Sequence, residues 1–265
     1  MKFLYTQKKL ETLKLTIQST SFKLFAKNDN DKYQFKLKEL SIVDLIKKSS
    51  RFDEDNLKEF LLTQDSVEKL VMKCTFSKDI YEIFLVKFEN IKTLHISIID
   101  FPRNLKNIKV NKNLTKLILD GRDDDPDQYS QFLSIFPNIA DITFTNQIPF
   151  ETLSCLPNLC NSLTSLSLHR LLPGNHRNVK FLALKEFHLE IYDGINDWSD
   201  LVISNPTIES LAFKTIFKSS NFDADKLIKV FELLPNMMHL ILKEDMIFKS
   251  HLFQNMKQSI KISLV

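Results

Sequence analysis

Two stretches of this sequence share one pattern, and they read Phe132-Leu-Ser-Ile-Phe-Pro137-Asn138-Ile139-Ala-Asp-Ile142-Thr-Phe144 and Phe231-Glu-Leu-Leu-Pro235-Asn236-Met237-Met-His-Leu240-Ile-Leu242. In each, a short apolar segment ends at a proline, whose ring cannot continue a helix. A hexad follows with apolar residues at its first, fourth and sixth positions, which is typical of a short strand. The pattern therefore predicts a helix, a sharp turn and a strand.

The hexad recurs along the whole chain, which indicates a repeat architecture. Its first positions are spaced by 21 to 30 residues and are Leu10, Leu37, Val67, Ile91, Leu114, Ile139, Leu163, Leu184, Ile208 and Met237. A shorter fragment at 260–264 predicts an eleventh strand. No unit of about 25 residues buries enough apolar surface to fold alone, so we expect neighbouring units to stack.

Helices are predicted between the strands, at 129–136, 197–203 and 223–234. Asp125 is a favourable N-cap before the first of them, and Pro126 suits the first helical position. An ordinary α/β sheet shows the same alternation, but its buried strands are near-continuous apolar runs. Here three strand positions in six are polar, which leaves one sheet face in solvent and favours a solenoid.

These repeats resemble the leucine-rich repeats of F-box/LRR proteins and, more distantly, those of ribonuclease inhibitors. The resemblance implies an α/β leucine-rich-repeat solenoid (a horseshoe) with parallel strands on its concave face and short helices on its convex face. It also implies one domain of about ten irregular repeats over residues 1–265. F-box/LRR proteins recognise substrates for cullin-type ubiquitin ligases. No F-box is found in this sequence, so a cullin-ligase adaptor is an expected partner only if an F-box lies upstream.

Composition and motifs argue against several other classes of protein. A net charge of +3 over 265 residues is too small for a dedicated nucleic-acid binder, and no apolar run is long enough for a membrane span. The three cysteines, at 74, 155 and 160, form no disulfide framework or zinc motif. We expect a cytoplasmic or nuclear protein that is not an enzyme and has no cofactor, metal site or catalytic residue. We also expect His169 and His176 to be solvated loop residues.

Polar strand positions two, three and five form the predicted concave face, where we expect a protein partner to bind. The candidate partner-binding residues are Lys92, His95, Lys116, Asp141, Thr143, Ser165, Ser167, Glu186 and His188. Mixed polarity of this kind suits a protein better than a phosphate backbone. The leading hypothesis is a non-enzymatic interaction module; the alternatives are a regulator of an enzyme, in the manner of ribonuclease inhibitor, and an enzyme whose site is assembled from distant loops.

Overall fold

The computed structural model describes eleven stretches of the chain in two compact units. The described residues are 4, 7–17, 33–44, 54–74, 76–98, 110–121, 125–170, 174–191, 198–215, 224–242 and 260–264. The first unit is Met1–Gly121 and the second is Arg122–Val265. Each is described by itself, and the single domain over residues 1–265 stays a prediction.

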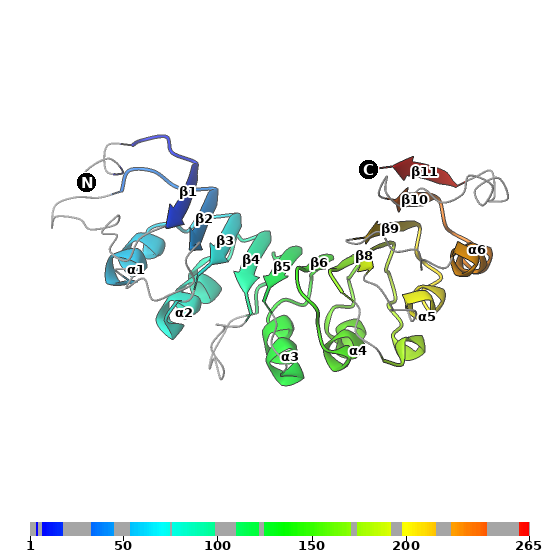
Figure 1. Cartoon of the computed structure of the whole chain (residues 1–265). Helices are drawn as coiled ribbons and strands as arrows, with labels where there is room; N and C mark the ends of the chain where they lie inside the picture. Colours follow the sequence, from blue (N-terminus) through cyan, green and yellow to red (C-terminus); the bar gives the residue numbers. More distant parts are fainter. Residues whose placement is uncertain are drawn as a thin grey trace. The chain divides into compact units, whose positions relative to one another are not determined.

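In the first unit, parallel strands follow one another in chain order, with helices on one side of them (Figure 1). Its elements are β1 (Thr12–Ile17), β2 (Glu39–Asp44), α1 (Glu54–Leu62), β3 (Lys69–Lys73), α2 (Lys78–Lys87), β4 (Thr93–Ser97) and β5 (Lys116–Asp120).

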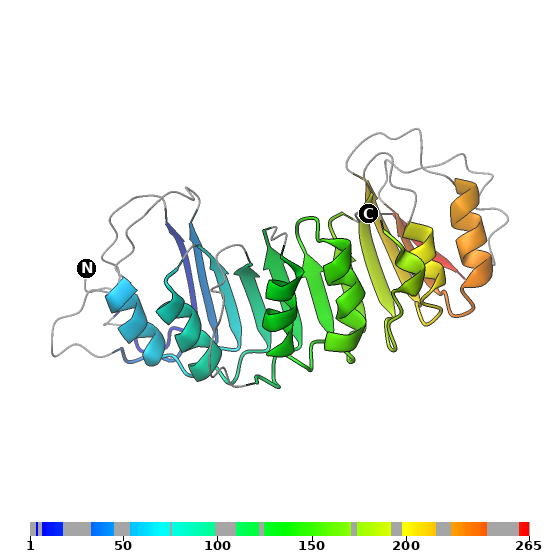
Figure 2. The ribbon, with the colours of Figure 1, turned by 90° about the horizontal axis from the view of Figure 1, so that it is seen from below.

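The second unit repeats this arrangement, and Figure 2 shows its helices lying over its strands. Its elements are α3 (Pro126–Ser134), β6 (Asp141–Phe144), α4 (Phe150–Leu159), β7 (Ser165–Leu168), the 3-10 helix η2 (His176–Asn178), β8 (Glu186–Ile191), α5 (Trp198–Ile203), β9 (Ser210–Thr215), α6 (Ala224–Leu233), β10 (His239–Leu242) and β11 (Lys261–Leu264). All ten predicted hexads and the eleventh strand are confirmed.

Equivalent hexad positions are register partners between neighbouring strands. Leu40 pairs with Leu70, and Leu70 pairs with Leu94. From the second hexad to the tenth, the first, fourth and sixth positions are all buried, because they point toward the helices. In the first hexad Leu13 and Leu15 are only half-buried, since β1 has a paired strand on one side only among the described residues.

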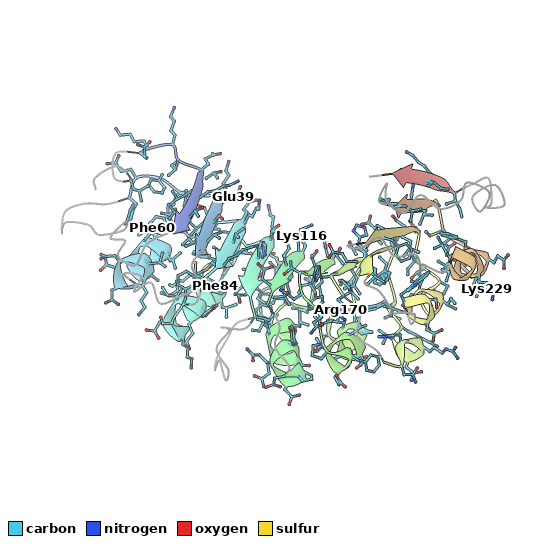
Figure 3. The ribbon with its side chains drawn as sticks, in the orientation of Figure 1. Glu39, Phe60, Phe84, Lys116, Arg170 and Lys229 are labelled. Atoms are coloured by element: carbon cyan, nitrogen blue, oxygen red, sulfur yellow. The ribbon has the colours of Figure 1, made fainter. Side chains whose placement is uncertain are left out.

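Aromatic side chains fill the space between the strands and the helices. Phe60 from α1 and Phe84 from α2 are fully buried there, and Figure 3 labels both. Helix α3 starts as predicted, because the Asp125 side chain accepts a hydrogen bond from the Asp127 backbone N at 3.1 Å. In the shortest repeat, between Leu163 and Leu184, the described residues between β7 and β8 form the three-residue η2 in place of a longer helix.

In three repeats an asparagine in the turn joins the repeat to the one before it. Asn90 Nδ2 donates to the backbone O of Asp65 at 3.1 Å, and Asn113 Nδ2 donates to that of Glu89 at 2.7 Å. Asn236 makes the equivalent bond in the second unit. Each of these asparagines stands one residue before a hexad. The spacing of the hexads along the sequence therefore also fixes where these connecting side chains lie.

One prediction about this part of the chain is wrong. His176 is not a solvated loop residue: it is 1% exposed and packs edge-on against the ring of Phe150 at a centroid distance of 5.2 Å. It belongs to η2, which occupies the place of a helix in this repeat and turns His176 toward the core, while Arg177 and Asn178 are exposed.

Candidate functional site

In each unit, we call the side of the strands that points away from the helices the strand face. The strand face of the second unit carries a groove. Its volume is about 740 Å³. The residues that line it lie in five consecutive strands, β6 to β10, or directly after β6 and β7. They are Thr143, Phe144, Thr145, Ser167, Leu168, His169, His188, Leu189, Glu190, Ala212, Phe213, Ile241 and Leu242.

One row of register partners runs across the groove at hexad position five. It consists of Thr143, Ser167, His188, Ala212 and Ile241. All five side chains are half-buried, so they remain open to a partner. The row changes in character along its length, from hydroxyl groups through imidazole to apolar side chains.

A second row lies two residues further along the strands and includes Thr145, His169 and Glu190. His169 Nδ1 contacts Glu190 Oε2 between the ends of β7 and β8. This carboxylate is mostly shielded, with 18% of the Glu190 side chain exposed. The groove therefore contains a carboxylate that already has an imidazole partner.

Six of the predicted partner-binding residues belong to the second unit, and three of them line the groove. Thr143, Ser167 and His188 are those three. The other three form a separate row of register partners at hexad position three and consist of Asp141, Ser165 and Glu186. They share the strand face with the groove but do not line it.

The remaining predicted residues, Lys92, His95 and Lys116, lie on the strand face of the first unit; Figure 3 labels Lys116 there. Lys92 Nζ donates to Glu68 Oε2 at 2.8 Å. This bond holds the pKa of the Glu68 carboxyl below its ordinary value of 4.5. His95 Nε2 lies 2.9 Å from Asp120 Oδ2.

The rest of this face is also extensively paired. Lys38 Nζ lies 2.9 Å from Glu11 Oε1, and the hydrogen bond that Lys38 donates to Glu11 raises the pKa of Lys38. Glu39 contacts both Lys14 and Lys69, at 3.4 and 3.0 Å. The hydrogen bond from Lys69 is the main cause that lowers the pKa of Glu39. These pairs make the strand face of the first unit a network of charges that neutralise one another.

Sequence reasoning predicted three of the five residues in the position-five row and missed the other two. Ala212 and Ile241 occupy hexad position five and could have been found from the repeat alone. His169 and Glu190 lie beyond the hexad, where the period gives no signal. The prediction that His169 is a solvated histidine is incomplete, because its ring is 32% exposed and contacts Glu190.

The described residues contain no group of three or more His, Cys, Asp or Glu side chains arranged to hold a metal ion. Burial raises the pKa of the Cys160 thiol to about 12, so this thiol is protonated near neutral pH and is a poor nucleophile or metal ligand. Ser167 and His188 are register partners, but the groove's carboxylate contacts His169 instead. In the described part of the chain, no helix has both the length and the apolar character needed to cross a membrane.

Comparison with known proteins identifies the fold. The structure is similar to that of the leucine-rich repeat-containing protein LegL7 from Legionella pneumophila, with a TM-score of 0.52 and 14% sequence identity. The similarity covers 94% of this chain and 82% of that chain. No protein-family model matches the sequence, and no curated protein matches it.

Proposed function

Because this chain has the leucine-rich-repeat fold, we propose that it is a non-enzymatic interaction module that binds a protein partner through the strand face of its second unit. The observation that carries the proposal is the groove of about 740 Å³ across β6 to β10. It combines an apolar floor with a few polar groups, which is the usual composition of a binding surface.

The strand face of the first unit is less suited to a partner than that of the second unit. Its lysines and carboxylates pair with one another across neighbouring strands, so a partner would have to displace existing ion pairs there. In the second unit the position-five row is open, and His188 has no hydrogen-bonding partner among the described residues. The groove therefore offers contacts that do not first have to be broken.

A charge-insertion experiment tests the proposal. The full chain and its Ala212→Glu variant are used to capture proteins from extracts of the cells that produce it. The control variant Gln131→Glu adds the same charge on the exposed surface of α3. We expect at least one protein to be retained by the wild type and the control but lost with Ala212→Glu. If no captured protein depends on residue 212, the proposal is wrong.

A finer proposal is that the partner is a substrate of an F-box-type ubiquitin ligase. Its support is the sequence resemblance of the helix, Pro-Asn turn and strand at 132–144 and 231–242 to F-box/LRR repeats. Binding of a cullin-ligase adaptor to the full-length gene product tests it. Absence of adaptor binding would remove the ligase role and leave the interaction module.

A further inference from the structure

Among the residues whose side chains the structure describes, the lining of the groove contains one acidic side chain and no lysine or arginine. The acidic side chain is Glu190, whose Oε2 is buried and contacts His169. A charged group of a partner entering the groove would lose hydration without gaining an unpaired opposite charge, which is costly. Because a charged group would find no unpaired opposite charge in the groove, we expect the occupant to be uncharged there.

Within the position-five row, the apolar residues lie at the β9 and β10 end of the groove. Ala212 is the smallest residue of the position-five row and lies between His188 and Ile241 in register. Its short side chain leaves space above β9, while its neighbours provide walls. Phe213 and Leu242, the next residues along β9 and β10, also border this end, with their side chains buried. Its shape and chemistry suit one bulky apolar side chain.

The β6 and β7 end of the groove provides hydroxyl groups. Thr143 and Ser167 are register partners there, and each hydroxyl can donate and accept a hydrogen bond. These groups suit the amide and carbonyl groups of a peptide backbone. Strands in a sheet lie about 4.8 Å apart, so the row from β6 to β10 spans roughly 19 Å, or about six residues of extended chain.

From this arrangement we propose that the groove binds an extended, uncharged segment of about six residues from the partner, which places a bulky apolar side chain over Ala212. The proposal rests on the proposed function, because it names the part of the partner that the interaction module recognises. The hydroxyl groups of Thr143 and Ser167 hold the backbone of the segment, and the space over Ala212 determines which side chain is accepted.

Selection from a display library of random seven-residue peptides against the full chain tests this inference. We expect the enriched peptides to share a leucine, methionine or aromatic residue and to lack charged residues beside it. Their affinity should fall at least tenfold for Ala212→Phe, because the new ring fills the space. Ala140→Phe is the matched control, since Ala140 is a half-buried residue of the same unit outside the groove lining.

A second variant, Ser167→Phe, fills the groove from β7 and keeps the test valid if Ala212→Phe fails to fold. Three outcomes would each overturn the inference. The first is enrichment of charged peptides, and the second is an equal loss of peptide affinity in Ala212→Phe and Ala140→Phe. The third is binding of small neutral compounds without any peptide. If peptides bind as expected but no cellular protein depends on residue 212, the inference stands and the proposed function fails. If a protein depends on residue 212 but the selected peptides are charged, the proposed function stands and the inference fails.

Discussion

Asn205 accepts a hydrogen bond from the backbone N of Phe181 at 2.7 Å, across the boundary between two repeats of the second unit. Its Nδ2 donates to the backbone O of Val179 at 2.9 Å and to that of Leu201 at 2.7 Å. The residue is fully buried. Gln64 plays the same part in the first unit, accepting from the backbone N of Leu37 at 2.9 Å. Buried amides therefore satisfy backbone groups in the turns and, for Leu201, in the last turn of α5.

Replacement of this amide should be strongly destabilising. Asn205→Ala leaves two carbonyl groups and one N–H group in the interior without this partner, and each such group costs about 1–3 kcal/mol. We expect the free energy of unfolding, measured by urea denaturation, to fall by roughly 2–4 kcal/mol. Asn236→Ala is the control: it removes one exposed bond to Pro206 and should cost less than about 1 kcal/mol.

Gly174 should not tolerate a side chain. A Cβ atom at this position would overlap the ring of Phe150, which also packs against the buried His176. We expect Gly174→Ala to lower the free energy of unfolding by about 1–3 kcal/mol through overpacking. In the double variant Gly174→Ala/Phe150→Ala the cost of the alanine should largely disappear. A cost that is unchanged in the double variant would show that the ring is not its cause.

Acid should weaken the ion pairs on the strand face of the first unit. Lys69 and Lys92 hold the pKa of the carboxyl groups of Glu39 and Glu68 below 4.5 in the folded chain. A lowered folded-state pKa stabilises the fold above the unfolded value, and that stabilisation is lost as the pH falls through the folded value. Glu39→Gln should therefore show a smaller loss of stability than the wild type between about pH 5 and about pH 3.

Denaturant unfolding at several pH values measures this difference, with Glu186→Gln as the control. Glu186 makes no ion pair with the described residues, so its replacement should leave the acid dependence as in the wild type. The effect of Glu39→Gln should be small and should shrink in high salt, because these charges are exposed and screened. An effect that is equally large in 1 M salt, where the Debye length is about 3 Å, would contradict the ion-pair explanation.

The sequence was sufficient to predict the repeats because the hexad repeats a local physical requirement. Each hexad must turn three residues toward the helices, and in two repeats Pro137 and Pro235 stop the preceding helix from continuing. The groove depends on something the period does not contain, namely the relative sizes of neighbouring side chains at position five. Ala212 creates space only because His188 and Ile241 stand beside it in register. The contact of His169 with Glu190 joins the residue directly after β7 to a residue in β8, and both lie beyond their hexads, where the repeat makes no prediction.

The burial gradient at the end of the first unit gives a direct test of stacking. Leu13 and Leu70 both occupy hexad position four, but Leu70 is fully buried between β2 and β4, whereas Leu13 in β1 is half-buried. Leu70→Ala removes the same atoms as Leu13→Ala and leaves a cavity with repeats on both sides. We expect the first to cost about 2–5 kcal/mol and the second less than about 2 kcal/mol.

Urea denaturation of both variants, followed by circular dichroism, measures the two costs. The difference arises because stability in a stacked array is the sum of each repeat and its contacts with its neighbours, and Leu13 has fewer such contacts among the described residues. Equal costs would mean that β1 is as fully covered as β3. In that case the half-burial of Leu13 would not reflect its environment in solution, and the terminal position of β1 would have no consequence for stability.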